Sequence, residues 1–140
     1  MSKVAVVYWS STGNTEAMAN AVAEGAKAAG AEVISFESAD FSADKVDEFD
    51  AIAFGCPAMG DEVLEEDEFE PMFSECEEKL SGKKIGLFGS YGWGDGEWMH
   101  NWEDKCKEDG AVLVADGVIC QEEPDDDAVE SCKALGKALA

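Results

Sequence analysis

The chain has 140 residues, and its 32 acidic side chains against 10 lysines give a formal net charge of −22 at pH 7. This length predicts one domain, residues 1–140, with a substantial buried core. The acidic excess argues against nucleic acid and against an anionic membrane surface as partners, because both are bound through basic groups. No apolar run is long enough to cross a bilayer and none resembles a signal peptide, so we expect a cytoplasmic protein.

Five apolar runs rich in β-favouring residues predict strands. They are Val4–Tyr8, Val33–Phe36, Ala51–Gly55, Ile85–Gly89 and Ala111–Cys120, the last with a break near Asp116-Gly117. Such runs leave no polar face, which is typical of strands in a parallel sheet that is covered on both sides.

Segments with helical periodicity alternate with these runs. They are residues 14–29 closed by Gly30, a short segment within 42–47, the stripe from Phe69 to Leu80, the stripe from Trp98 to Cys106 closed by Gly110, and a C-terminal helix capped by Asp125 or Asp126. Strands that alternate with helices predict an α/β fold, a doubly wound five-stranded parallel sheet with right-handed crossovers and helices on both faces.

The turn after the first predicted strand is dense in hydrogen-bonding side chains. It contains the uncharged residues Ser10, Ser11, Thr12, Gly13, Asn14 and Thr15. The helix that follows presents unpaired N–H groups and a partial positive charge to a bound anion. One such side chain would be enough to cap the helix. Five of them favour a phosphate site built from neutral donors over an ordinary capping turn.

Two further unusual loops follow the third and fourth predicted strands. The second loop contains Pro57, Ala58, Met59, Gly60, Asp61 and Glu62, and the third contains Ser90, Tyr91, Gly92, Trp93, Gly94 and Asp95. Ligands of doubly wound sheets bind beyond the carboxyl ends of the strands, so we expect all three loops to open on one edge.

The second and third loops suit a flat ring. Met59 and Trp93 could pack on its two faces, although Trp93 could instead fold back onto the protein. Gly60 leaves its peptide free to point either way, and Glu62 offers an acceptor for a ring N–H. A phosphate at one end and a planar ring at the other describe a mononucleotide-like ligand.

Cysteines and acids add two expectations. The five cysteines form no C-x-x-C pair, so we expect buried free thiols in a reducing compartment rather than disulfides or a zinc site. Ten acids within residues 61–78 lie beside the second loop. A charge concentrated on one side favours docking of basic protein surfaces.

The three loops together resemble those of the flavodoxins, specifically the short-chain clostridial type. Residues 6–15, 58–62 and 88–96 carry the resemblance, which extends over essentially the whole chain. It implies non-covalently bound FMN, the strand order 2-1-3-4-5, and low-potential one-electron transfer between redox proteins with basic docking surfaces. It also implies an electron carrier rather than an enzyme, with no catalytic residue and no metal.

The resemblance implies a role for each loop as well. Ser10 to Thr15 would hold the phosphate, Met59 and Trp93 would flank the ring, Glu62 would accept from ring N3, Gly60 would serve ring N5, and the backbone of Ser90 to Gly92 and of Asp95 would line the pyrimidine side. Pro57 stands where some relatives have a serine that reaches toward the ribityl chain, so its contact would come from the backbone. Ala58, Asp61 and Gly94 complete the predicted contacts.

Two other classes fit less well. A signalling receiver domain needs acids after the first strand, a phosphorylatable aspartate after the third and a lysine after the fifth. At those positions this chain has Tyr8-Trp9-Ser10, Gly55-Cys56-Pro57 and Cys120-Gln121-Glu122, so the required residues are missing. An FMN-dependent reductase acting on small molecules is the alternative, but the chain shows no second domain, no G-x-G-x-x-G motif and no arginine. We expect a monomer.

Overall fold

A parallel sheet forms the centre of the computed structural model, which describes residues 2–10, 13–58, 64–91 and 96–140. Its strands are β1 (Lys3–Tyr8), β2 (Glu32–Glu37), β3 (Ala51–Gly55), β4 (Lys84–Tyr91), β5 (Val112–Leu113) and β6 (Val118–Gln121). They lie in the order β2-β1-β3-β4-β5, and β6 also pairs with β4. The predicted doubly wound parallel sheet and its order are confirmed.

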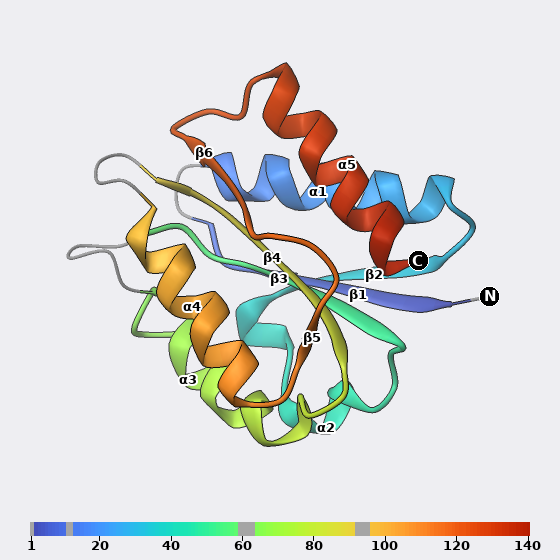
Figure 1. Ribbon diagram of the computed structural model, residues 1–140, viewed down its shortest axis with the longest axis vertical. Helices are drawn as coiled ribbons and strands as arrows, with labels where there is room; N and C mark the ends of the chain where they lie inside the picture. Colours follow the sequence, from blue (N-terminus) through green and yellow to red (C-terminus); the bar gives the residue numbers. More distant parts are fainter. Residues whose placement is uncertain (1, 11–12, 59–63, 92–95) are drawn as a thin grey trace.

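Helices cover both faces of the sheet (Figure 1). They are α1 (Asn14–Ala28), α2 (Ala43–Val46), α3 (Phe69–Cys76), α4 (Glu97–Glu108) and α5 (Asp126–Leu139), with short 3-10 turns η1 (Ser38–Asp40) and η2 (Glu77–Lys79). Figure 1 shows α1 and α5 on one face and α2, α3 and α4 on the other. Among the described helices, none is both long and apolar enough to cross a membrane.

The last predicted strand is divided near Asp116-Gly117, as expected. β5 pairs with the start of β4 and β6 with its end. Between them, Gly117 N donates a 2.7 Å hydrogen bond to Glu103 Oε2 of α4. A Cβ at Gly117 would lie 2.6 Å from Met99 Sδ, so the chain passes very close to α4 here. The fifth strand is therefore two segments rather than one continuous strand.

The central strands are buried on both faces, but an edge strand is not. β3 is buried at every position, and β1 at all but its ends. β2 lies at the edge of the sheet, where Ile34 is 39 % exposed. The expectation of two covered faces is therefore wrong for β2, because a strand with one neighbour receives less cover from the helices.

The predicted helical stripes are the buried faces of their helices. Buried members include Phe69, Met72, Phe73 and Cys76 of α3 and Trp98, Trp102 and Cys106 of α4. Asp125 rather than Asp126 caps α5, since its side chain accepts from Ala128 N at 2.8 Å. The stripes follow from the helical period, because the core faces one side of each helix.

The cysteines are free, and four of them are buried. Burial raises the pKa of each of these thiols to about 12, namely Cys56, Cys76, Cys106 and Cys132. They therefore stay protonated and unreactive at neutral pH. Cys120 is half-buried, so the expectation of buried free thiols is confirmed for four of the five.

Two glycines allow α1 and α5 to pack closely. A Cβ at Gly25 would lie 2.0 Å from Lys133 O, and a Cβ at Gly136 would lie 2.0 Å from Val22 O. Neither position can hold a larger residue unless the two helices move apart. The close contact lies in the second half of α1, away from its start.

We predict that Gly136→Ala destabilises the protein by about 1–3 kcal/mol because the added methyl group forces the helices apart. Helix propensity alone would change the free energy of unfolding in the opposite direction, because alanine in a helix is about 1 kcal/mol more favourable than glycine. Urea unfolding measures the difference, with Ser131→Ala at an exposed position of α5 as the control. A Gly136→Ala variant as stable as the unmodified protein would contradict the close contact.

Candidate functional site

Backbone hydrogen bonds continue the sheet beyond the carboxyl ends of β1 and β3, and join them to β3 and β4. They run from Trp9 N to Gly55 O (3.0 Å), from Cys56 N to Phe88 O (3.1 Å) and from Ala58 N to Ser90 O (3.0 Å). β1, β3 and β4 end at the same edge (Figure 1), so the three loops that follow them begin side by side.

Gly89 allows a close approach between two backbone segments at this edge. A Cβ at Gly89 would lie 2.2 Å from Cys56 O. Trp98 Nε1 of α4 donates to the same carbonyl oxygen at 3.3 Å. The beginning of the second loop is therefore held between β4 and α4, and any larger residue at Gly89 would displace it.

The start of α1 is built around the Ser10 hydroxyl. Gly13 precedes the helix with φ of 94°, a left-handed conformation that favours glycine, and it has no side chain with which to cap the helix. Ser10 Oγ takes that role by accepting from Gly13 N at 3.1 Å and from Glu16 N at 3.3 Å. A hydroxyl that accepts keeps its own proton, so Ser10 can donate to an anion at this helix terminus.

A buried pair of hydroxyls joins α1 to β4. Thr15 Oγ1 lies 3.1 Å from Ser90 Oγ, and the two residues are 1 % and 5 % exposed. The pair carries two protons and uses one of them between its members, which leaves the other for a further acceptor. The structure thus brings together two predicted site residues from different loops.

Glu16 is the acid nearest to the start of α1 in the chain, and a hydroxyl donor restrains it. Tyr8 OH donates to Glu16 Oε2 at 3.3 Å. Burial and the neighbouring Glu16 raise the pKa of Tyr8, so the phenol remains a donor at neutral pH. The Glu16 carboxylate therefore already accepts a hydrogen bond from Tyr8, the last residue of β1.

Sequence reasoning missed a buried carboxylate beside the second loop. Glu65 is 6 % exposed, and its carboxylate accepts from Asp67 N at 2.9 Å, Glu68 N at 2.7 Å and Phe69 N at 2.8 Å. Its own N–H donates to Cys56 Sγ at 3.3 Å. Glu65 therefore ties the far end of the second loop both to the start of α3 and to the residue after β3.

The first loop is tied to the same helix start. Trp9 Nε1 donates to Glu68 Oε2 at 2.9 Å, and its ring packs against the core. The sequence did not reveal this hydrogen bond, because a contact across 59 positions leaves no local pattern. Glu65 did offer a signal, an acid just before a predicted helix, but the long acidic run concealed it.

Tyr91 begins the third loop and is half-buried. Its ring packs against Trp98 with centroids 5.5 Å apart, and its carbonyl oxygen accepts from Glu122 N at 2.7 Å. Tyr91 is therefore held by α4 and by the end of β6. The predicted contact of its backbone with the ligand stays a prediction.

Eight of the predicted site residues lie in the described part of the chain. They are Ser10, Gly13, Asn14, Thr15, Pro57, Ala58, Ser90 and Tyr91, all at the carboxyl ends of β1, β3 and β4 or at the start of α1. The other ten lie outside the described residues: Ser11, Thr12, Met59, Gly60, Asp61, Glu62, Gly92, Trp93, Gly94 and Asp95. Their roles stay predictions. Within the described ranges, no group of three or more His, Cys, Asp or Glu side chains could hold a metal ion.

The donor set fits the phosphate of a mononucleotide. Backbone N–H groups at the start of α1, the Ser10 hydroxyl and one proton of the Thr15–Ser90 pair are all neutral donors. The chain has no lysine within residues 10–15, 57–62 or 90–95. A site of this kind at the point where the strand order reverses, between β1 and β3, defines a mononucleotide-binding α/β protein.

Comparison with known proteins identifies the family. The Flavodoxin family profile matches residues 6–136. Flavodoxin from Megasphaera elsdenii is 50 % identical over 137 residues, covering 98 % of this chain and 98 % of that protein. Flavodoxin from Clostridium beijerinckii is 48 % identical over 135 residues, covering 96 % and 97 %. The solution structure of two-electron reduced M. elsdenii flavodoxin matches with a TM-score of 0.88 at 51 % identity over 97 % of each chain.

The chain therefore belongs to the flavodoxin family. Flavodoxins are FMN-binding electron-transfer proteins rather than enzymes. Membership of this family confirms the predicted cofactor, FMN, and the predicted role, electron transfer. Flavodoxins are known to bind FMN at the switch point of a sheet with the order 2-1-3-4-5. The general location of FMN therefore follows from the family and not from the contacts described above.

The pKa of Glu65 predicts how the helix start responds to pH. Burial alone would raise the pKa of this carboxyl, but the hydrogen bonds from Phe69, Glu68 and Asp67 outweigh burial and lower it. A lowered pKa means that the folded state favours the charged form. The resulting stabilisation is complete above the unfolded-chain value of about 4.3 and is lost as the pH falls through the lower folded value.

We predict that Glu65→Gln lowers the free energy of unfolding by about 1.5–3 kcal/mol at pH 7, since three hydrogen bonds to a charged acceptor are weakened. The difference from the unmodified protein should shrink below the unfolded-chain value, where protonation of the carboxyl begins to remove the stabilisation. Denaturant unfolding at pH 7 and pH 3 measures both values, with Glu75→Gln on the exposed side of α3 as the control. An equal loss at both pH values would contradict the role of the charge.

Proposed function

We propose that residues 1–140 form a single FMN-binding domain in which the phosphate lies at the start of α1. The observation that carries the proposal is the Ser10 hydroxyl, which accepts from Gly13 N and Glu16 N and keeps its proton for the anion. The buried Thr15–Ser90 pair supports it with a second hydroxyl proton between the first and third loops. Neutral donors suffice here because the helix terminus adds a partial positive charge.

The second and third loops hold the ring in this proposal. Met59 and Trp93 pack against its two faces, Glu62 accepts from N3, and Gly60 serves N5. The backbone of Ser90 to Gly92 and of Asp95 lines the pyrimidine side, and the backbone at Pro57 and Ala58 completes the contact, beside Asp61 and Gly94. The described ends of these loops support the arrangement, because hydrogen bonds join Ala58 to Ser90 and Cys56 to Phe88.

Bound FMN supplies one-electron redox chemistry, and the acids beside the second loop make its reduction harder. Glu65, Glu66 and Asp67 follow that loop directly, and the only lysine among residues 57–82 is Lys79. Glu66 and Asp67 are exposed and screened by water, whereas Glu65 is buried, and the effect comes from the sum of all three. Added negative charge on the cofactor is therefore disfavoured, which suits a carrier of low potential.

The same acidic surface selects the partners. We propose that this carrier is a cytoplasmic monomer that docks redox proteins through their basic surfaces. Its support is the formal net charge of −22, which raises the association rate with basic partners and keeps copies of the chain apart. Screening by salt should weaken both effects.

We predict that the FMN-loaded protein, reduced anaerobically, passes electrons to a basic acceptor such as cytochrome c, with a rate that falls as ionic strength rises. Stopped-flow absorbance at increasing NaCl concentration measures this dependence. The isolated protein should show no steady oxidation of NADH or NADPH. Sustained oxidation of either would instead favour the FMN-dependent reductase.

We also predict that Ser10→Ala weakens FMN binding by about tenfold or more, since it removes a hydrogen bond to a charged group. Riboflavin, which lacks the phosphate, should lose much less affinity. Titration of flavin fluorescence measures both constants, with Ser131→Ala as the control. Equal losses for FMN and riboflavin would show that Ser10 supports the loop and does not bind the phosphate.

A further inference from the structure

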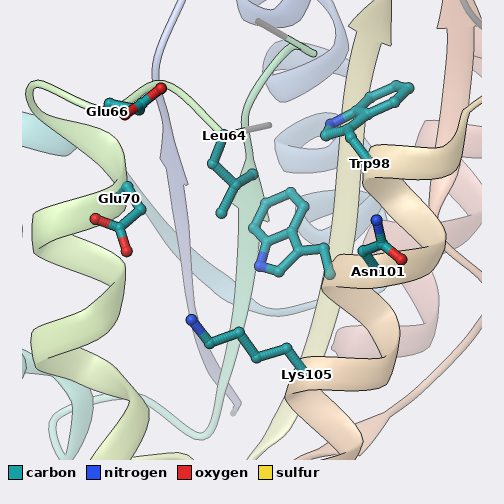
Figure 2. Close-up of a pocket in the computed structure, with 7 residues that line it drawn as sticks. Leu64, Glu66, Glu70, Trp98, Asn101 and Lys105 are labelled. Carbon is teal, nitrogen blue, oxygen red and sulfur yellow. The ribbon is translucent and has the colours of Figure 1, made fainter. Parts of the chain in front are cut away.

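A pocket lies between α3 and α4, apart from the loop ends assigned to FMN (Figure 2). It has a volume of about 470 Å³ and is lined by Leu64, Glu66, Glu70, Trp98, Asn101, Trp102 and Lys105. Leu64 and the two tryptophans give it apolar walls. The remaining residues place charged and amide groups around them.

The charges of the pocket favour a cationic occupant. Lys105 Nζ lies 3.2 Å from Glu77 Oε1, so the cation of the pocket already has a carboxylate partner. Glu70 Oε1 accepts from Ser74 Oγ at 2.9 Å. Across the described ranges, no ion pair involves Glu66 or Glu70. Figure 2 shows both carboxylates on the α3 side of the pocket.

The two carboxylates favour arginine over lysine as the source of that cation. A guanidinium group binds a carboxylate with two parallel hydrogen bonds, whereas an ammonium group offers only a point charge. Trp98 and Trp102 also line the pocket, but they are only 2 % and 3 % exposed, so each adds an apolar edge rather than an open face. Apolar walls also accept the aliphatic stem of an arginine.

Trp102 has a donor that this occupant could use. Its Nε1 is buried and meets no acceptor among the described residues. Buried N–H groups are normally paired, and an arginine residue brings a backbone carbonyl close to its side chain. An acceptor can reach the indole N–H only if a neighbouring side chain shifts, so the Trp102 indole resonance should report entry into the pocket.

The pocket shares a wall with the candidate flavin site. Trp98 Nε1 donates to Cys56 O at 3.3 Å, and the Trp98 ring packs against Tyr91 at 5.5 Å. Tyr91 is one of the residues assigned to FMN, and Cys56 directly precedes Pro57, which is another. A protein anchored in the pocket would therefore lie against the end of the molecule that carries the candidate flavin site.

We propose that the pocket between α3 and α4 receives an arginine side chain of a redox partner protein. The proposal rests on the electron-carrier function and adds to it a particular point of attachment. Glu66 and Glu70 bind the guanidinium group, and Trp98 and Leu64 pack against its stem. The general acidic surface attracts the partner, whereas this contact fixes its orientation.

The first experiment uses the FMN-loaded, ¹⁵N-labelled protein with N-acetyl-arginine amide as the probe. It is run at pH 8, above the pKa of about 7 to which burial and the neighbouring Asp109 raise Glu77, so that Lys105 keeps its charged partner. We expect the indole resonances of Trp98 and Trp102 to shift with saturation, and that of Trp9 to shift less. N-acetyl-citrulline amide, the uncharged analogue, should cause at least threefold smaller shifts. Equal shifts with both probes, or none at Trp98 and Trp102, would overturn the proposal.

The second experiment compares two double variants with the same change in net charge. Glu66→Gln/Glu70→Gln removes the acids of the pocket, and Glu32→Gln/Glu48→Gln removes two exposed acids elsewhere on the surface. We expect the pocket variant to bind the arginine probe at least threefold more weakly and to transfer electrons to cytochrome c about threefold more slowly at low salt. The control variant should change each value by less than half as much.

The outcomes separate this inference from the carrier function. If both variants slow electron transfer equally, only net charge matters and the anchor is wrong. Arginine binding without any effect of Glu66→Gln/Glu70→Gln on transfer would show a ligand pocket that takes no part in docking, which also overturns the proposal. Failure of the unmodified protein to transfer electrons would instead count against the carrier function, while the probe experiment still tests the pocket.

Discussion

Three backbone hydrogen bonds near the carboxyl ends of β1, β3 and β4 determine where the three loops of the proposed site begin. They join Trp9 to Gly55, Cys56 to Phe88 and Ala58 to Ser90, so loops separated by tens of residues begin within hydrogen-bond distance of one another. This arrangement is possible because a parallel sheet places the carboxyl ends of all its strands at one edge. It also requires glycine at position 89, where a Cβ would lie 2.2 Å from Cys56 O. The proposed anion site thereby comes to lie beside the described beginnings of the two loops to which we assign the ring.

The start of α3 is the second point on which the site depends. Glu65 closes the far end of the second loop through three backbone hydrogen bonds, and Glu68 holds the Trp9 side chain from the first. Acids in this one segment consequently have different tasks. Glu65 is buried and structural, whereas Glu66 and Glu70 line a pocket at the surface. A count of charges cannot separate these tasks, but burial and hydrogen-bond partners do.

The fold was predictable from local patterns, and the site only in outline. Apolar runs and helical stripes placed β3, α3 and α4, because such periodicities report which residues face the core. The polar density of Ser10 to Thr15 predicted an anion site for a physical reason, the needs of a helix start. The Thr15–Ser90 pair, the Trp9–Glu68 contact and the capping by Glu65 could not be predicted, since the first two link residues 75 and 59 positions apart and the third is one acid among many. The exposed face of β2 was missed because an apolar run does not reveal whether its strand lies at an edge.

The location of the FMN site is the claim on which the rest depends, and chemical-shift mapping tests it most directly. Amide ¹H–¹⁵N spectra of the apoprotein and of the FMN-loaded protein should differ most at Ser10, Gly13 to Thr15, Ala58, Ser90 and Tyr91. Residues at the opposite edge of the sheet, such as Glu32 and Lys84, should keep their resonances. Shifts confined to the pocket between α3 and α4, or to the amino ends of the strands, would contradict the account.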